Sequence, residues 1–316
     1  MTEFLTMLRN VLLFVALAIP GYLLVKTKLM GEKSSGILSK LLTYIGMPFL
    51  ILSSTLNVSF SGGFALKIAV VGIAGAVFTI VAFLLSAFLV KKGEEEKRKG
   101  MLRFCMVFSN NGFLGIPLAK AVFGDSPVVT YVIILNIVTN VLMFTLGVYL
   151  ISGDKSLISI KKAFLNPVLI AFIVGIGFNL LKVAKYVPEV GTFSGHFSNM
   201  VTPLSMTILG MKMAELAFLD LFTKVKMYYV AAIKLIAMPV FAVAIMFALR
   251  LLFTVDNEIM FGVFIALSMP TAGLASAFSD RYNGDTENAV AYTLGTTVLS
   301  IVTIPVFYWL LCLMIG

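Results

Sequence analysis

Long apolar stretches, each about the length that crosses a lipid bilayer, recur along the chain from end to end. A transmembrane helix needs roughly 20 mainly apolar residues, because each residue advances a helix by about 1.5 Å and the hydrocarbon core is about 30 Å thick. Short polar loops separate ten such stretches, at 4–26, 35–56, 66–90, 102–124, 127–151, 164–183, 197–219, 225–251, 258–280 and 286–314. The pattern predicts an all-α integral membrane protein with ten transmembrane helices in a single domain, residues 1–316.

Composition agrees with this pattern and excludes a soluble domain carrying one anchor. Hydrophobic residues make up 60% of the chain, charged residues make up 12%, and the mean hydropathy is +1.04, whereas soluble domains carry about 25% charged residues. The net charge of +9 does not indicate nucleic-acid binding, because the basic residues lie in particular loops and not along one helix face. Cys105 and Cys312 both lie in apolar stretches, which favours buried thiols over a disulfide.

Basic residues are concentrated in the loops after the first, third, fifth, seventh and ninth stretches, as with Lys97, Arg98 and Lys155. The positive-inside rule places these loops in the cytoplasm. We therefore expect a multi-pass protein of the cell (inner) membrane with both termini on the extracytoplasmic side.

Two weak sequence matches at a common offset indicate an internal repeat. Residues 21–26 match residues 177–182, an offset of 156, and residues 48–52 fall opposite residues 203–207, an offset of 155. The repeats are predicted at about 1–153 and about 160–316. Because each copy holds five helices, an odd number, the second copy enters the membrane from the opposite side and the repeat is inverted.

Two segments interrupt stretches that would otherwise cross the bilayer as continuous helix. Residues 109–117 read Ser-Asn-Asn-Gly-Phe-Leu-Gly-Ile-Pro, and residues 268–273 read Ser-Met-Pro-Thr-Ala-Gly. A proline removes one backbone donor and clashes with the carbonyl four residues earlier, and an unsatisfied backbone group in lipid costs several kcal/mol. Broken helices therefore persist where they line a site, and one in each half of the chain indicates the binding site of a secondary transporter.

We expect the second halves of these two helices to begin near Pro117 and Pro270, since proline is favoured at the first helical position. A helix N-terminus carries free N–H groups and about half a positive charge, so two such ends near the midplane favour an anion. Carbonyls that end the first halves are suited to a cation, which leaves coupling to Na⁺ or H⁺ open. No resident cofactor or metal is predicted.

The candidate substrate-binding residues belong to the two breaks and to the fifth stretch: Asn110, Asn111, Gly112, Gly115, Pro117, Asn136, Asn140, Ser268, Pro270 and Thr271. Asn136 and Asn140 are four residues apart and share one helix face, and an amide in hydrocarbon must meet a partner helix or a cavity. Hydrogen bonding between helices is the alternative for this pair, and helix capping is the alternative for Asn110 and Asn111.

Few charged residues lie within the apolar stretches. Lys234 and Lys120 are candidates for a charge role, with snorkelling to the membrane surface as the alternative for each. Arg281 closes the ninth stretch and is interpreted as an interfacial residue. The single histidine, His196, lies in a predicted loop and cannot supply the ligands of a metalloprotease, so no catalytic residue and no enzyme activity are predicted.

The motif Asn-Asn-Gly-Phe-Leu-Gly-Ile-Pro at 110–117, supported by the element around Pro270, resembles the auxin efflux carrier family. This family includes the plant PIN-FORMED exporters and bacterial malonate- or malate-type carriers. The resemblance implies that the breaks of helices 4 and 9 cross to form the substrate site. It also implies that helices 3–5 and 8–10 move as a transport domain, while helices 1, 2, 6 and 7 form a scaffold that mediates homodimerisation. The loop after the fifth stretch is short, which favours a bacterial or archaeal carrier.

The sequence thus predicts a carrier of a small organic anion, working by an elevator-like alternating-access mechanism in the lipid bilayer. A monocarboxylate, a dicarboxylate such as malonate or malate, or an auxin-like indole acid would fit such a site. The alternative is a sodium- or proton-coupled organic-anion symporter of the bile-acid carrier type. A channel is a third hypothesis, which saturable flux would exclude.

Overall fold

The computed structural model describes residues 2–31, 34–56, 63–91, 93–159, 161, 164–215, 223–251 and 255–315. Within these ranges every regular element is helical, apart from one isolated backbone bridge. The helices are α1 (Thr2–Lys26), α2 (Ser34–Leu41), η1 (Leu42–Gly46), α3 (Met47–Thr55), α4 (Phe64–Leu89), α5 (Glu96–Val107), η2 (Asn111–Gly115), α6 (Ile116–Phe123), α7 (Pro127–Leu142), η3 (Met143–Gly147), α8 (Val148–Ser152), η4 (Lys155–Leu157), α10 (Pro167–Leu180), α11 (Val183–Tyr186), α12 (Glu189–Glu215), α14 (Val225–Ala232), η5 (Ile233–Ala237), α15 (Met238–Arg250), α16 (Asn257–Ser268), α17 (Ala275–Arg281) and α18 (Thr286–Ile315).

Among the described residues, six helical runs are long and apolar enough to cross a membrane: Phe4–Lys26, Ser34–Thr55, Phe64–Leu89, Pro127–Ser152, Val225–Arg250 and Thr286–Ile315. Three shorter apolar helices accompany them, at Asn111–Phe123, Pro167–Leu180 and Asn257–Ser268. The prediction of an all-α, multi-pass membrane protein is confirmed. Helical segments also occupy the other predicted stretches, but ten crossings and an inverted repeat stay predictions.

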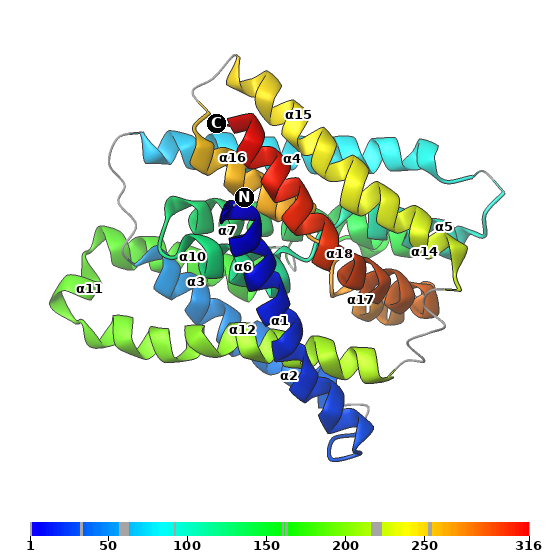
Figure 1. Cartoon of the computed structure of the whole chain (residues 1–316), viewed down its shortest axis with the longest axis horizontal. Helices are drawn as coiled ribbons and strands as arrows, with labels where there is room; N and C mark the ends of the chain where they lie inside the picture. Colours follow the sequence, from blue (N-terminus) through cyan, green and yellow to red (C-terminus); the bar gives the residue numbers. More distant parts are fainter. Residues whose placement is uncertain are drawn as a thin grey trace.

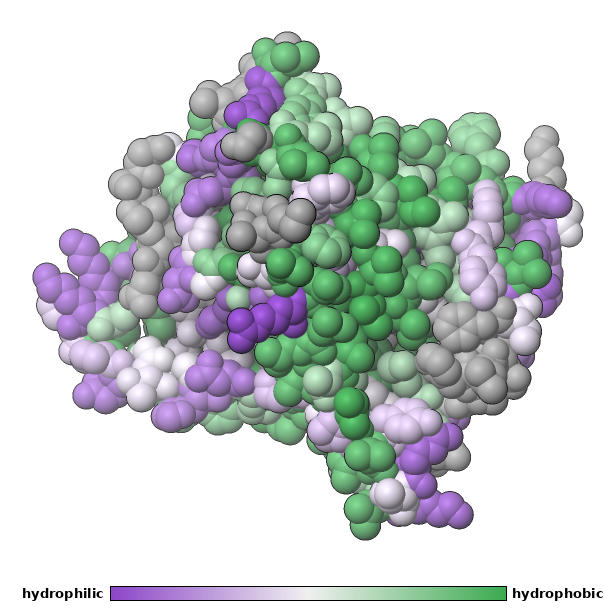
Figure 2. Space-filling model, viewed as in Figure 1, coloured by the Kyte–Doolittle hydropathy of each residue, from purple (hydrophilic) through white to green (hydrophobic). Residues whose placement is uncertain are grey.

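The helices pack in two groups (Figure 1). In the first group α1 crosses α12, α12 packs on α3, and α3 packs on α10. In the second group α7 lies between α4 and α16, α15 packs on α16, and α18 packs on α14 and α17. Hydrophobic residues cover the middle of the face seen in Figure 2, and hydrophilic residues gather mainly toward its edges. This distribution is the one expected for helices that run through a hydrocarbon layer.

Ion pairs join several helices of the second group at one polar end. Lys226 of α14 binds the carboxylate of Glu94, just before α5, and Lys224 pairs with Glu287 of α18. The hydrogen bond from Lys226 holds the pKa of the Glu94 carboxyl below its usual range, because the bond favours the charged form. These contacts connect α5, α14 and α18 outside the apolar layer.

Two glycines allow α1 and α12 to approach each other closely. A Cβ atom on Gly21 of α1 would lie 1.9 Å from the carbonyl oxygen of Thr207, and one on Gly210 of α12 would lie 1.8 Å from that of Ala18. Small residues at a crossing let helix backbones pack in direct contact, which is a main source of helix association in membranes. Side chains larger than hydrogen cannot be accommodated at either position without separating the helices.

We expect Gly210→Ala to lower the thermal stability of the protein, because overpacking costs about 1–3 kcal/mol and the clash here is with backbone. Gly195→Ala is the matched control on the same helix, since a Cβ there meets nothing within 4 Å. Alanine is the better helix former, so the control should keep or slightly raise the melting temperature. Equal melting temperatures for the two variants in detergent would contradict this account of the packing between α1 and α12.

Candidate functional site

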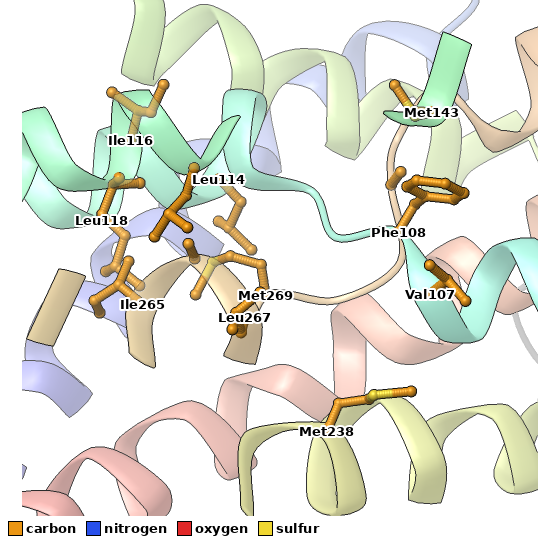
Figure 3. Close-up of a cluster of buried hydrophobic side chains, with 14 of the residues drawn as sticks. Val107, Phe108, Leu114, Ile116, Leu118, Met143, Met238, Ile265, Leu267 and Met269 are labelled. Atoms are coloured by element: carbon orange, nitrogen blue, oxygen red, sulfur yellow. The ribbon is translucent and has the colours of Figure 1, made fainter. Parts of the chain in front are cut away.

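Helices α5 and α16 both end inside the protein and give way to extended backbone. The chain becomes extended at Phe108 after α5, and at Met269 after α16. Figure 3 shows the two extended segments running alongside each other between the helix ends. The Asn110 N–H donates to the Pro270 carbonyl over 2.8 Å, and the Ala272 N–H donates to the Phe108 carbonyl over 3.0 Å. Each interrupted helix therefore satisfies part of the other's free backbone, as burial in an apolar layer requires.

Ser109 and Thr271 form the centre of this antiparallel bridge. Thr271 is fully buried, and its hydroxyl donates to the Cys105 carbonyl over 2.9 Å, while its N–H donates to the hydroxyl of Thr296 over 3.2 Å. These bonds attach the segment after α16 to both α5 and α18. Thr271 is predicted from the sequence as a binding residue, but in the structure its bonds hold the two extended segments together. We call these two segments, 108–110 and 269–272, the crossing of the broken helices.

Lys234 lies directly against the crossing. It belongs to η5, its residue is 1% exposed, and its ammonium donates to the Val107 carbonyl over 3.3 Å and to the Ser109 hydroxyl over 2.5 Å. Val107 is the last residue of α5, so this carbonyl is one that a helix C-terminus leaves free. A positive charge next to the negative end of a helix is stabilising. The location inside the protein does not fit the alternative of snorkelling to the membrane surface.

The predicted restart points of the two broken helices are wrong. The fourth stretch resumes at Asn111 with the π-helix η2, so Pro117 is the second residue of α6 and lies beyond the break. The ninth stretch resumes only at Ala275, and Pro270 lies in the extended segment. The wider turn of η2 accommodates the missing donor of Pro117, and the backbone bridge holds Pro270 extended, so neither proline starts a helix.

A cavity of about 330 Å³ lies beside the crossing. Its walls come from both helix groups and from both broken helices: Thr43, Tyr44, Met47, Ser109, Asn110, Gly112, Phe113, Asn136, Asn140, Met143, Phe144, Leu165, Asn166, Pro167, Val168, Ala272, Gly273, Leu274 and Arg281. Arg281 is the one charged residue among the described residues that line it. The polar lining is otherwise made of amides, hydroxyls and backbone.

Three π-helical segments border this cavity. Thr43 and Tyr44 belong to η1, Phe113 belongs to η2, and Phe144 belongs to η3. Short π-helical turns occur frequently at functional sites, because the wider turn frees backbone groups and re-aims side chains. The concentration of such turns around one cavity supports a functional role for it.

The structure divides the predicted substrate-binding residues into two sets. Asn110, Gly112, Asn136 and Asn140 line the cavity. The others do not line it, and these are Asn111, Gly115, Pro117, Ser268, Pro270 and Thr271. Asn111 is 1% exposed and donates to the Thr139 hydroxyl over 3.3 Å, so its amide supports the wall.

Among the other predicted residues, Gly115 packs on the side chain of Met269, and Ser268 is buried. Lys120 donates to the Ser198 hydroxyl over 3.3 Å and thereby connects α6 with α12. It does not reach the cavity.

The two asparagines of α7 form a pair at the cavity wall. The Asn140 side-chain N–H donates to the Asn136 oxygen over 3.2 Å. Asn136 is 4% exposed, and its own Nδ2 has no hydrogen-bond partner among the described residues. A buried donor without an acceptor is costly, so this amide is suited to a ligand that brings one.

The sequence interpretation missed several lining residues, of which Arg281 carries the only charge. The sequence places Arg281 at the membrane interface, because it directly follows the ninth apolar stretch. The helix α17 that precedes it has seven residues and begins directly after the crossing, so its end stays close to the site. Asn166 and Phe144 were missed because no pattern along the chain places them beside the two breaks.

Two families match this chain, one in each half. Residues 6–159 match the family described as membrane transport protein, and residues 204–316 match the sodium bile acid symporter family. The chain is therefore similar to membrane transporters of these two families, each over one part of its length. The resemblance to auxin efflux carriers is confirmed at the level of the first family.

Two archaeal proteins described as uncharacterized transporters are similar to this chain over almost their whole length. The one from Methanothermobacter thermautotrophicus is 26% identical over 303 residues, covering 94% of this chain and 96% of its own. The one from Methanocaldococcus jannaschii is 27% identical over 316 residues, covering 95% of this chain and 97% of its own. Transport is thus the function class that the comparisons support, and they leave the substrate open.

Proposed function

We propose that the protein is a secondary transporter of a small organic anion, which binds in the cavity beside the crossing and reaches the two sides of the membrane alternately. The observation that carries this proposal is the lining of the cavity. Amide groups and one arginine face it, and no carboxylate does among the described residues. Hydrogen-bond donors together with one positive charge favour an anion over a cation.

The size of the cavity fits this substrate class. A volume of about 330 Å³ is near the lower end of ligand pockets, which span about 300–1,000 Å³. Small mono- or dicarboxylates such as malonate or malate need only a fraction of this volume. An auxin-like indole acid would use more of the apolar wall formed by Met47, Phe113 and Phe144.

The position of the cavity between the two helix groups supports an elevator-like movement. Tyr44 lies in η1, which continues into α3 of the first group, and Asn166 caps α10 of the same group. Asn136 and Arg281 lie in α7 and α17 of the second group. A shift of one group along the other would move the crossing and carry the bound anion with it. By the positive-inside rule the loops next to Asn166 and Arg281 face the cytoplasm, so we expect the cavity to open toward that side.

Coupling to sodium or protons is the second candidate mechanism, and the match of residues 204–316 to the sodium bile acid symporter family favours it. The contacts of Lys234 argue for transport without sodium. Its ammonium already neutralises the Val107 carbonyl at the end of α5, where a bound cation would otherwise be attracted.

Uptake of radiolabelled malonate, malate and indole-acetate into proteoliposomes tests these mechanisms, with and without a sodium or proton gradient. Saturable uptake of one anion without a gradient is the expected result. Uptake only with an imposed ion gradient would support the coupled symporter. Unitary currents without saturation would show a channel and would contradict both.

We expect Asn136→Ala to raise the KM for the transported anion by about tenfold, because a hydrogen bond to a charged ligand contributes about 1.5–3 kcal/mol. Asn179→Ala is a suitable control, since that amide donates to the carbonyls of Thr55 and Leu56 away from the cavity. The control should keep its KM. An unchanged KM in a folded Asn136→Ala protein would remove this amide from the binding site.

A further inference from the structure

Arg281 combines a cavity position with a positive charge that no carboxylate of the described residues neutralises. Among the residues that the structure describes, its one charge-related contact is with the ring of Tyr282, whose centroid lies 5.8 Å from the guanidinium carbon. The neighbouring carboxylate of Asp280 accepts a hydrogen bond from Thr286 over 2.7 Å. The guanidinium therefore retains donors for a ligand.

Aromatic packing fixes the helix that carries Arg281 against the cavity wall. Phe278 of α17 packs on Phe144, with ring centroids 5.0 Å apart, and on Phe104, with centroids 5.8 Å apart. Phe144 itself lines the cavity. At 1.5 Å per residue, α17 advances only about 9 Å between Ala275 and Arg281. A long arginine side chain is thus anchored within reach of a ligand that lies at the crossing.

A second group without a partner lies in the same cavity. The Asn136 Nδ2 donor is buried and lacks an acceptor among the described residues, and Asn140 holds the Asn136 amide through its oxygen. The cavity therefore presents a neutral donor on α7 and a charged donor group on α17. One donor is neutral and the other is positively charged. A ligand that satisfies both must therefore carry an anionic group and a separate hydrogen-bond acceptor.

We propose that Arg281 is a specificity-determining residue that binds a carboxylate of the transported anion, while Asn136 donates to a second acceptor on the same molecule. The substrate class is then a short dicarboxylate, or a carboxylate with a second acceptor of similar reach. This inference rests on the proposed function and deepens it. The planar guanidinium can bind a carboxylate through two parallel hydrogen bonds, which an ammonium group cannot do.

The test compares a dicarboxylate with its diamide, which keeps the shape but replaces both carboxylates by uncharged carboxamides. Proteoliposomes would contain wild type, Arg281→Gln, Arg281→Lys or the control Lys155→Gln. Lys155 is a matched control because it is also exposed, also lies over a tyrosine ring, at 5.9 Å from Tyr149, and does not line the cavity. Uptake kinetics would be measured with malonate and malonamide, and with malate and its diamide.

We expect Arg281→Gln to raise the KM for the dicarboxylate by about tenfold or more and to change the KM for the diamide much less, since the charge-assisted pair requires a carboxylate on the ligand. Arg281→Lys should restore part of the affinity, and Lys155→Gln should behave as wild type. An equal rise in KM for both ligands, or no rise for either, would overturn the role of Arg281.

The outcomes separate this inference from the proposed function. If wild type takes up malonate or malate and Arg281→Gln does so with unchanged KM, only the inference fails. Uptake of indole-acetate alone would also overturn it, because that anion has a single carboxylate and no second acceptor. If wild type takes up none of these anions, the proposed function fails and the inference fails with it.

Discussion

Replacing Lys234 by methionine should reduce anion uptake by about 100-fold while leaving the protein folded. Methionine keeps most of the side-chain volume but removes the donor to the Val107 carbonyl and the Ser109 hydroxyl. The buried Val107 carbonyl would be left without this partner, which costs about 1–3 kcal/mol, and about 1.4 kcal/mol corresponds to a factor of ten. Both groups lie at the crossing, so the cost is concentrated in the element that forms the cavity wall.

Uptake at saturating anion, with thermal unfolding measured on the same preparations, checks this expectation. Lys226→Met is the matched control in the preceding helix, because its ammonium pairs with Glu94 in a partly exposed position and such pairs contribute little. Wild-type transport by a folded Lys234→Met protein would show that the buried ammonium is dispensable. Transport that Lys234→Met regains in high sodium would instead show that a free cation can replace it.

The sequence was sufficient to locate the two breaks, and the reason is physical. Proline, glycine and asparagine within an apolar stretch have few stable arrangements in lipid, so residues 109–117 and 268–273 had to be irregular. Where each helix resumes could not be read in the same way. The start of η2 at Asn111 depends on a π turn, and the start of α17 at Ala275 depends on the backbone bridge to the other segment. Both are tertiary effects.

The residues of the candidate site could be predicted only where local helical spacing brings their side chains together. Asn136 and Asn140 share a face because of helical spacing, and both line the cavity. Asn111 adjoins Asn110 in sequence, yet the start of η2 turns its amide toward Thr139. Arg281 reaches the cavity because the crossing shortens the second half of its helix, and no local pattern contains that information.

The crossing itself should be equally sensitive, so we expect Ala272→Pro to reduce uptake by about 100-fold. Proline removes the N–H that donates to the Phe108 carbonyl over 3.0 Å, and this buried carbonyl then has no replacement donor in an apolar layer. Proline also requires an extended residue before it, and Thr271 already is one. The substitution therefore tests mainly the loss of one hydrogen bond of the bridge.

Ala272→Ser is the control for the same position, because serine keeps the backbone N–H and adds only a hydroxyl at the cavity wall. It should retain uptake within a few-fold of wild type, while Ala272→Pro loses it even in protein that unfolds cooperatively. If the proline variant transports as well as the serine variant, the backbone bridge between the broken helices is not required. The movement of the substrate would then have to depend on side-chain contacts such as those of Lys234, since that residue holds the α5 side of the crossing independently of Ala272.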